Sequence, residues 1–353
     1  MERSFDWLVI LIALGSVLWQ GFCSGETRHC TDPTGKPGQC IPAHRCSYVL
    51  ELTRQGPLSD ENKRLLKQSV CSVSNTGKAV VSVCCPIEKL PKPPHCGFGE
   101  TDRLLGGQRA FLSEFPWTAI VEYRQNTSNE TGHHCGGTLI NSRYVLTAAH
   151  CVQPRSGHDW EAVGVRLGEH DLNTALDCEF EQCEEPPVTV GIEKIIVHDG
   201  YSPQSKAQHD DIALIRLDRD VEYSVNVSPV CLPVEESDRT RNISGAWGVK
   251  SVGWGISESG TVKHEKFKTQ LSIVDRKSCM ETIGTELRDT QLCTEVRRDR
   301  DVCAADSGGL LILRSRSMAM CNILYGISSF GKSSLCGTKR DPAVFTDVTK
   351  YIQ

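Results

Sequence analysis

The number of cysteines, 18 in a chain of 353 residues, constrains the fold of this protein more than any other feature of its sequence. Only an oxidising compartment keeps so many thiols paired, so the sequence predicts a secreted protein with several disulfides. A zinc protein is the competing interpretation. It is disfavoured because Cys303 and Cys336 have no partners at the spacing of zinc ligands, and because the adjacent Cys84 and Cys85 are poorly arranged to bind one ion.

The N-terminal segment agrees with secretion. The apolar run Trp7–Trp19 has the length of a signal peptide and is shorter than the roughly 20 residues of a membrane span. Small residues follow at Ser24 and Gly25, so we predict a signal peptide over residues 1–25, whose removal takes away Cys23. An uncleaved anchor is the less favoured alternative, and no later segment could span a bilayer.

The composition argues against binding to nucleic acid. The 39 basic and 44 acidic residues give a net charge of −5, so bulk charge does not attract the chain to a polyanion. Aromatic residues make up 6% of the chain, too few for a base-stacking surface to be the first expectation.

Two regions of different composition follow the predicted signal peptide. Six cysteines lie between residues 30 and 85, in a block too small to be stable without disulfides, and their fifteen pairings cannot be distinguished from sequence. We predict a disulfide-rich domain over residues 26–86 and a stiff, proline-containing linker over residues 87–103.

From Leu104 onward, short β-rich runs alternate with turn residues, which predicts an antiparallel sandwich or barrel. Asp275–Ile283 is the best helical candidate, with Asp275 able to cap it. The clearest strand candidates are Thr118–Glu122, Tyr144–Thr147, Ile192–Val197 and Ile212–Leu217. Sequons that predict N-glycans on an extracellular surface occur at Asn126, Asn129, Asn226 and Asn242.

Three short segments carry groups that suit one reaction: Thr147–Cys151, Asp211–Leu214 and Asp306–Gly309. Alone, each has a structural explanation, with His150 beside a disulfide, Asp211 as a strand cap, and the segment of Ser307 as a turn. Together, in a secreted β-rich chain, they supply the hydroxyl nucleophile, the base and the orienting carboxylate that acyl transfer needs.

The region from residue 104 to residue 353 resembles the chymotrypsin (S1) family of serine proteases. The three segments match that family, as do Leu104–Gly107 and Cys135–Leu139, and together they span nearly the whole region. Residues 30–85 resemble the clip domain that precedes such proteases in arthropods. The resemblance implies an all-β fold of two antiparallel six-stranded barrels over residues 104–353, preceded by a small disulfide-rich clip domain, with the family's C-terminal helix truncated.

The resemblance also implies the catalytic roles. Ser307 attacks the scissile carbonyl, His150 takes its proton and returns it to the leaving amine, and Asp211 orients the imidazole. The backbone N–H groups of Ala305 and Ser307 form the oxyanion hole. No cofactor is required for this chemistry.

Substrate choice follows from Asp301, six residues before Ser307, whose position in trypsin-like members selects Arg or Lys. The alternative is that Asp301 is a solvated member of the charged run of residues 297–301. The resemblance places the remaining substrate-binding residues at Ser329, Phe330, Gly331 and Ala343.

Activation is implied at Arg103–Leu104. A cut after Arg103 frees the amine of Leu104, which would pair with Asp306 and order the substrate pocket and the oxyanion hole. The activating enzyme must itself be trypsin-like, because it reads Arg103.

The resemblance apportions most of the cysteines and leaves Cys321 over, as a free thiol or an intermolecular link. It implies the protease pairs Cys135–Cys151, Cys178–Cys183, Cys279–Cys293 and Cys303–Cys336, the tether Cys96–Cys231, and the clip pairs Cys30–Cys84, Cys40–Cys71 and Cys46–Cys85.

A structural calcium ion is a further expectation from the resemblance. Glu169, Asp171, Thr174 and Asp177 lie in a loop similar to the calcium loop of the family and offer hard oxygen ligands. An ordinary acidic surface loop is the alternative.

Departures from the family pattern leave two functions open. Ala305 replaces a glycine, Leu310 replaces a proline, and Val302 and Ala343 stand where smaller or polar residues usually line the substrate pocket. The favoured function is a secreted serine endopeptidase zymogen that cuts after Arg or Lys in a proenzyme or cytokine precursor of an immune or melanisation cascade. A serpin is its expected inhibitor, and no nucleic acid or membrane partner is expected. The alternative is a catalytically weak or inactive homologue that acts as a binding cofactor.

Overall fold

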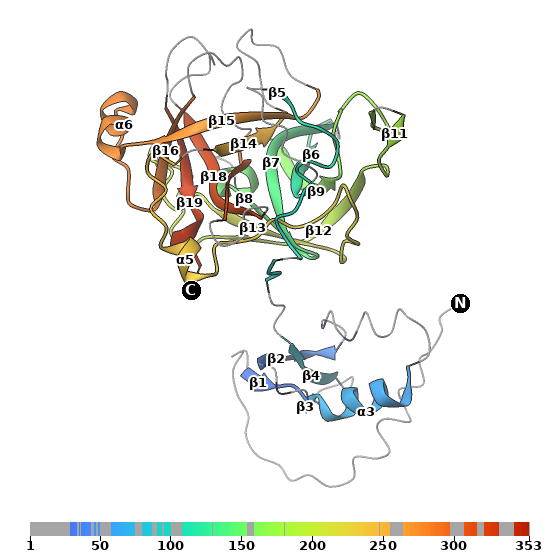
Figure 1. Cartoon of the computed structure of the whole chain (residues 1–353). Helices are drawn as coiled ribbons and strands as arrows, with labels where there is room; N and C mark the ends of the chain where they lie inside the picture. Colours follow the sequence, from blue (N-terminus) through green and yellow to red (C-terminus); the bar gives the residue numbers. More distant parts are fainter. Residues whose placement is uncertain are drawn as a thin grey trace. The chain divides into compact units, whose positions relative to one another are not determined.

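The computed structural model describes residues 29–33, 35, 37–43, 46, 49, 58–74, 80–86, 90–93, 95–99, 108–128, 130–153, 159–179, 181–246, 248–254, 264–296, 307–315, 321–331 and 342–352. The chain divides into two compact units, residues 1–89 and residues 90–353 (Figure 1). No described helix is both long and apolar enough to cross a membrane.

The first unit is a four-stranded antiparallel sheet in the order β1-β2-β4-β3. Helix α3, Asp60–Gln68, begins at Ser59, whose hydroxyl accepts a hydrogen bond from the backbone N–H of Asn62 at 3.2 Å. The strands are β1 (His29–Thr31), β2 (Pro37–Pro42), β3 (Val70–Ser74) and β4 (Val80–Pro86).

Disulfides supply the stability that the small apolar core of the first unit cannot. Cys84 and Cys85 are consecutive on β4, so their side chains leave opposite faces of the sheet and reach different partners. The three disulfides of this unit are Cys30–Cys84, Cys40–Cys71 and Cys46–Cys85. Each loop of this size that a disulfide closes is worth about 4 kcal/mol in the chain-entropy account.

The second unit begins with a closed antiparallel barrel in the order β12-β13-β8-β7-β6-β9. Strand β13 alternates buried and half-buried residues, as a strand with one face on the core must. The barrel strands are β6 (Thr118–Gln125), β7 (Thr131–Asn141), β8 (Tyr144–Thr147), β9 (Trp160–Leu167), β12 (Val188–Val197) and β13 (Ala213–Leu217). The hairpin of β10 (Cys178–Glu179) and β11 (Gln182–Cys183) lies between β9 and β12 in the sequence and is closed by the disulfide Cys178–Cys183.

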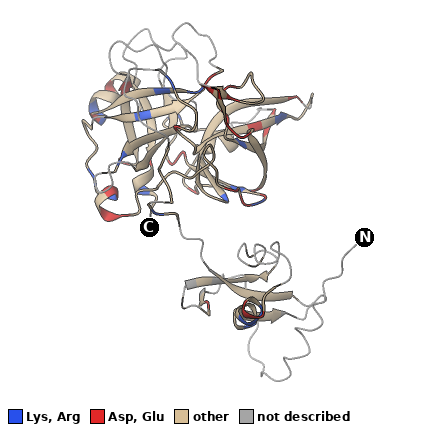
Figure 2. Ribbon diagram, turned by 45° about the vertical axis from the view of Figure 1, so that its right-hand side comes forward, with Lys and Arg blue, Asp and Glu red and all other residues tan. Residues whose placement is uncertain are grey.

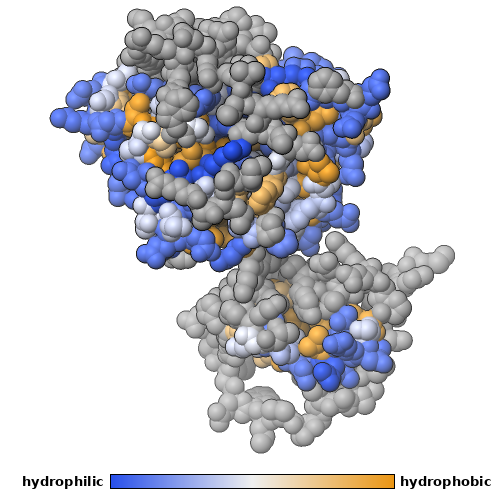
Figure 3. Space-filling view, in the orientation of Figure 1, coloured by the Kyte–Doolittle hydropathy of each residue, from blue (hydrophilic) through white to orange (hydrophobic). Residues whose placement is uncertain are grey.

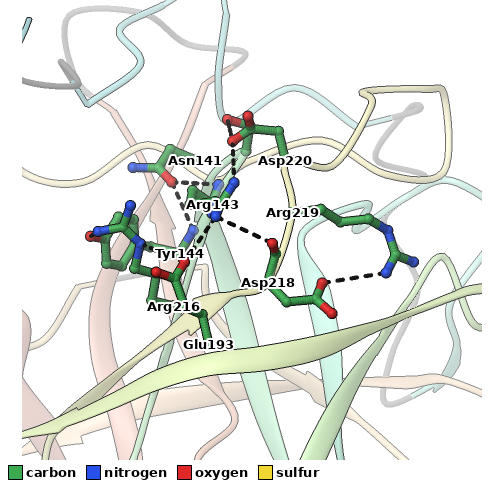
Figure 4. A network of polar contacts seen from close by, with 9 residues as sticks. Asn141, Arg143, Tyr144, Glu193, Arg216, Asp218, Arg219 and Asp220 are labelled. Carbon is green, nitrogen blue, oxygen red and sulfur yellow. Dashed lines mark hydrogen bonds and ion pairs between the residues drawn. The ribbon is translucent and has the colours of Figure 1, made fainter. Parts of the chain in front are cut away.

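A buried arginine fixes the turn between β7 and β8 (Figure 4). The guanidinium of Arg143 is bonded to Glu193 at 2.8 Å and lies 3.6 Å from Asp220. The side-chain oxygen of Asn141 accepts hydrogen bonds from the backbone N–H groups of Arg143 and Tyr144, both at 2.8 Å. This network holds the start of β8, the strand that leads into the candidate site.

The second barrel consists of β14, β17, β18, β19, β16 and β15, and pairing of β14 with β15 closes it. Strand β5, Gln108–Arg109, adds to the free edge of β15. The barrel strands are β14 (Val249–Gly253), β15 (Phe267–Val274), β16 (Gln291–Val296), β17 (Leu310–Arg314), β18 (Asn322–Gly331) and β19 (Ala343–Asp347). The expected all-β architecture of two six-stranded antiparallel barrels is confirmed.

Short helices connect the strands. Helix α6, Arg276–Ile283, begins at Asp275, whose carboxylate accepts from the backbone N–H of Ser278 at 3.0 Å, and it ends at the left-handed Gly284. The helix expected at Asp275–Ile283 is therefore confirmed, with Asp275 as its cap. The other helices in the described part of the second unit are α4 (Ala149–Val152), α5 (Glu236–Arg239) and the 3-10 turn η2 (Val348–Lys350).

The two barrels share one apolar core. Trp117, Leu139 and Ile215 of the first barrel belong to the same buried cluster as Leu310 and Ile312 of the second. At about 25 cal/mol per Å² of buried apolar surface, this shared core favours a single arrangement of the barrels. On the described surface, basic and acidic residues are interspersed (Figure 2), and hydrophilic residues surround small apolar patches on the face shown in Figure 3.

Candidate active site

The imidazole of His150 is held by Asp211 through two hydrogen bonds. Strand β13 pairs with β8 in the register Ala213↔Thr147, which brings the residues that follow β8 beside those that precede β13. One carboxylate oxygen of Asp211 lies 2.8 Å from Nδ1 of His150, and the other accepts from the backbone N–H of His150 at 2.9 Å. A carboxylate at Nδ1 places the ring proton there, so Nε2 keeps the lone pair that a general base needs.

Asp211 is fully buried, and its other contacts come from the second barrel. The hydroxyl of Ser329 donates to the carboxylate oxygen that also contacts Nδ1 of His150. The hydroxyl of Thr346 donates to the backbone carbonyl of Asp211 at 2.8 Å. Because buried polar oxygens are costly without partners, these donors satisfy Asp211 and hold it beside the imidazole.

The turn that carries Ser307 is anchored to both barrels through its backbone. Its carbonyl accepts a hydrogen bond from the N–H of Gly136 on β7 at 2.8 Å, and the N–H of Gly308 donates to Ser328 on β18 at 2.9 Å. The sulfur of Cys151 lies 3.7 Å from Nε2 of His150. The same sulfur lies 3.0 Å from the position that a Cβ on Gly308 would take. The turn that carries Ser307 and the imidazole of His150 therefore both lie close to the sulfur of Cys151.

Gly308 makes this anchorage possible. Its φ of 75° is in the left-handed region, which favours glycine. A Cβ there would lie 2.4 Å from the hydroxyl oxygen of Thr147 and 2.5 Å from the carbonyl oxygen of Gly136. Among the described contacts, the hydroxyl of Ser307 makes no hydrogen bond to His150, and such bonds commonly tighten only when substrate is bound.

The expected substrate-binding residues lie in different local environments. They are Ser329, Phe330, Gly331 and Ala343. The side chain of Ser329 points to Asp211 and donates a hydrogen bond to its carboxylate, a contact that the sequence did not predict. Phe330 and Gly331 end β18 and pair with Val344 and Ala343 of β19. Ala343 is buried, and its carbonyl accepts from the hydroxyl of Thr294 at 3.3 Å.

Several expected site residues lie outside the described residues. They are Asp301 and Val302 of the substrate pocket, Ala305 of the oxyanion hole, Asp306, the cleavage residues Arg103 and Leu104, the pair Cys303 and Cys336, and Asn129.

The described disulfides of the second unit pair the same cysteines that the resemblance implies. Cys135–Cys151 links β7 to α4 and so fixes His150 near Gly136. Cys96–Cys231 attaches the segment before the first barrel. The other two are Cys178–Cys183 and Cys279–Cys293.

Cys321 is a buried free thiol, not an exposed one available to a second chain. Its sulfur lies 3.2 Å from that of Cys231, and burial raises its pKa to about 11. At pH 7 only about one thiol in ten thousand is then ionised. We expect a maleimide to leave Cys321 unmodified in the native protein and to label it after unfolding, as measured by peptide mapping with C321S as the control. Rapid native labelling, or a disulfide-linked dimer on a non-reducing gel, would contradict this.

The side chains of the expected calcium ligands have other partners in this structure. The carboxylate of Asp177 accepts from the N–H of His170 and the hydroxyl of Thr174, Glu169 is paired with Arg166 at 3.1 Å, and Asp171 accepts from a neighbouring N–H. Calcium ligands lie 2.3–2.6 Å from the ion, which requires three or more oxygens to converge. Among the described residues, the group of His, Cys, Asp or Glu side chains that converge closely is Cys135, His150 and Cys151, a disulfide and the candidate base, so calcium binding by the loop stays a prediction.

The burial of Asn226 argues against the glycan that its sequon predicts. Asn226 is 4% exposed, and its side-chain nitrogen donates to the carbonyl of Glu185 at 2.8 Å, so a glycan on that atom has no room. Asn126 and Asn242 are exposed, as a glycan acceptor must be.

Two six-stranded antiparallel barrels, with a His–Asp pair on one and a serine anchored to the other, define the architecture of chymotrypsin-like serine proteases. Comparison with known families agrees: residues 104–353 match the trypsin family and residues 30–85 match the regulatory CLIP domain of proteinases. The chain belongs to the trypsin family of serine proteases and carries an N-terminal CLIP domain. Members of this family need no cofactor for their chemistry.

Similar proteins share both regions. CLIP domain-containing serine protease B4 of Anopheles gambiae is 38% identical over 334 residues, covering 92% of this chain and 89% of the relative. Melanization protease 1 of Drosophila melanogaster is 35% identical, covering 92% and 91%. The crystal structure of the Drosophila Grass clip serine protease of the Toll pathway has a TM-score of 0.65 and 28% sequence identity, covering 92% of this chain and 95% of that one.

Proposed function

We propose that this protein is a secreted, trypsin-like serine endopeptidase made as a zymogen and activated by cleavage after Arg103. In this proposal, residues 1–25 are removed on secretion, residues 26–86 form the clip domain, residues 87–103 form the linker and activation segment, and the protease begins at Leu104. The active enzyme cuts proteins after Arg, or after Lys, with Asp301 as the acidic group that binds the basic side chain.

The observation that carries the proposal is the double hydrogen bond from His150 to the buried Asp211. It fixes the tautomer and the orientation of the imidazole, and Nε2 lies 3.7 Å from the sulfur of Cys151, near which Gly308 of the Ser307 turn also lies. A merely structural histidine does not need a buried carboxylate at Nδ1. In the proposed mechanism, Nε2 takes the proton of Ser307 as its oxygen attacks the scissile carbonyl, and then gives that proton to the leaving amine.

The proposed substrate is a protein precursor, a proenzyme or a cytokine precursor, in an extracellular immune or melanisation cascade. The relatives support this choice, because one is a melanization protease and another is a clip protease of the Toll pathway. An upstream trypsin-like protease would cut at Arg103, and a serpin would inhibit the active enzyme.

The test is to cut the purified zymogen and to measure hydrolysis of an Arg-amide substrate. Material cut after Arg103 should turn the substrate over, whereas uncut zymogen and an R103Q variant given the same treatment should not. Mass spectrometry would locate the cut. Cut protein whose turnover equals that of the S307A variant would overturn the proposal.

The second candidate function is a clip-domain binding cofactor with a weak or inactive protease unit. It is motivated by Ala305 and Val302 in the sequence and by the buried Ala343. A serine-directed phosphonate separates the two functions, because stoichiometric labelling of Ser307 in the cut protein requires an assembled nucleophile and base. Absence of labelling would favour the cofactor.

A further inference from the structure

The turn that leads into Asp211 has an unusual backbone. Gln208 and Asp210 have φ angles of 46° and 56°, in the left-handed region that residues with a Cβ seldom adopt. The N–H of Ile212 donates to the carbonyl of Asp210 at 2.8 Å, which closes a tight three-residue turn around Asp211. The backbone of Asp210 therefore helps to set the direction in which the Asp211 side chain leaves the turn.

A tyrosine hydroxyl holds the side chain of each left-handed residue. Tyr351 donates to a carboxylate oxygen of Asp210 at 2.8 Å, and Tyr201 donates to the side-chain oxygen of Gln208 at 3.1 Å. Strained backbone persists only where its surroundings over-determine it, so such a turn requires contacts of this kind. The bond from Tyr351 is the shorter of the two, and it reaches the residue next to Asp211.

The carboxylate of Asp210 is held at its second oxygen as well. That oxygen lies 3.4 Å from the guanidinium of Arg288. A Cβ added to Gly200 would lie 2.6 Å from the same oxygen, so the backbone at Gly200 packs directly against the carboxylate. Only 14% of the Asp210 side chain is exposed. A side chain with so little freedom restrains its own backbone.

The ring of Tyr351 is connected to the chain on the other side of Asp211. It meets the imidazole of His198 edge-on, with the ring centres 5.1 Å apart. The N–H of His198 donates to the carbonyl of Ile212 at 3.2 Å. Tyr351 is thus connected to both neighbours of Asp211, to Asp210 by its hydroxyl and to Ile212 through His198.

Tyr351 belongs to a segment of the second barrel that also contacts Asp211 itself. It follows the 3-10 turn η2, and its N–H donates to the carbonyl of Val348 at 3.1 Å. Earlier in the segment, on β19, the hydroxyl of Thr346 donates to the carbonyl of Asp211 at 2.8 Å. The second barrel therefore holds the turn of the catalytic acid at two points.

We infer that Tyr351 is a positioning residue: its hydroxyl, through Asp210, holds the left-handed turn that aims the Asp211 carboxylate at His150. The inference rests on the proposed function, because it gives Tyr351 a part in proteolysis. Since Tyr351 acts through Asp210, the loss of its hydroxyl affects turnover only by moving Asp211.

Without the hydroxyl of Tyr351, the turn can relax toward an ordinary backbone conformation. The Asp211 carboxylate then loses its alignment with Nδ1 and the backbone N–H of His150, which lie 2.8 and 2.9 Å from its oxygens. The imidazole is no longer held in one orientation, and proton transfer from Ser307 slows. Because the triad carboxylate acts on the imidazole and not on the substrate, kcat falls and KM does not.

The experiment compares the cut wild-type enzyme with the variant Y351F, which removes one oxygen and keeps the ring. We expect kcat for an Arg-amide substrate to fall at least about 10-fold, because misplacing a catalytic group by about 1 Å can cost about 100-fold. KM should change by less than about 2-fold. The NMR signal of the Nδ1 proton of His150, identified by its loss in D211N, should shift or broaden in Y351F.

Y325F is the matched control. Tyr325 is a buried tyrosine of the second barrel, and its hydroxyl donates to the backbone carbonyl of Asp238 at 3.2 Å. It belongs to a different apolar cluster from the one against which Tyr351 packs. Loss of this hydroxyl should lower the unfolding midpoint but leave kcat, KM and the His150 signal at their wild-type values.

Two substitutions of Asp210 test whether Tyr351 acts through it. D210A removes the acceptor of the Tyr351 bond, whereas D210N keeps an oxygen that can accept it. D210A should therefore lose at least as much kcat as Y351F, and adding Y351F to D210A should cause no further loss, because the bond is already absent. D210N should keep the wild-type His150 signal.

Either a wild-type kcat or an unchanged His150 signal in Y351F would overturn the inference, as would equal losses in Y351F and Y325F. So would a further loss on adding Y351F to D210A, because Tyr351 would then act independently of Asp210. If Y351F does not fold, D210A compared with D210N decides by the same measurements. If the cut wild-type protein has no turnover, the proposed function fails. The His150 signal then decides the inference, because the uncut chain already has the bond from Nδ1 to Asp211.

Discussion

Replacing Asp211 with asparagine should lower kcat of the cut enzyme by about 10⁴-fold, the size of the effect in the Ser-His-Asp template. In the structure, the Asp211 carboxylate accepts from both the backbone N–H and Nδ1 of His150. An asparagine amide can donate to Nδ1, which moves the ring proton to Nε2. That tautomer cannot accept the proton of Ser307. The measurement is steady-state hydrolysis of an Arg-amide substrate.

Asp210 provides the matched control for this change. It is the preceding residue, but its carboxylate contacts the hydroxyl of Tyr351 at 2.8 Å and Arg288 at 3.4 Å, and not the imidazole. Its positive φ of 56° is one that asparagine also tolerates. D210N should therefore change kcat by no more than about 3-fold, because asparagine keeps an oxygen that can accept from Tyr351 and the change does not touch the imidazole. Equal losses in both variants would show that Asp211 acts through folding and not through the base.

The second large effect is expected from G308A. The added Cβ would meet the hydroxyl of Thr147 and the carbonyl of Gly136 at 2.4 and 2.5 Å, so the turn that carries Ser307 must move. We expect a loss of about 3 kcal/mol in the free energy of unfolding, from backbone strain and overpacking together, and a fall of at least about 100-fold in kcat. Chemical denaturation and turnover measure the two effects.

The variant G284A separates the cost of backbone strain from the cost of the close atomic contacts at Gly308. Gly284 has a φ of 73°, close to the 75° of Gly308, but a Cβ there meets nothing within 4 Å. G284A should therefore lose only the cost of a left-handed alanine, about 1 kcal/mol, and should keep its activity. If G308A behaved like G284A, the close packing of the two barrels at Ser307 would not be what positions the nucleophile.

The sequence predicted the parts of the fold and site that are marked locally. Strand β8 was predicted at its observed bounds, and α6 was recognised from the cap at Asp275. His150, Asp211 and Ser307 could be picked out because each lies in a short segment with its own chemical character. Their proximity follows from the pairing of β8 with β13 and from the bond between Gly136 and Ser307, which only the folded chain specifies.

The sequence could not show which polar residues fold inward. Nothing in the segment His264–Lys268 indicates that Lys266 is buried, because its backbone pairs with His170, which comes from a loop far earlier in the chain. Asn226 has the pattern of a glycan acceptor, but the pattern carries no information on burial. Helix α3 was missed within the cysteine-rich block, although Ser59 followed by Asp60 and Glu61 is a start signal that could have revealed it.

The disulfide Cys96–Cys231 determines how the first unit can influence the protease after a cut at Arg103. The segment is held further by hydrogen bonds from Gly97 to Pro229 and from Asn322 to Gly97, both at 2.9 Å. The two fragments that this cleavage produces therefore remain covalently linked. If a surface binds the clip unit, the catalytic unit stays close to that surface. Its effective concentration there is on the order of millimolar, whatever the total concentration of enzyme in solution.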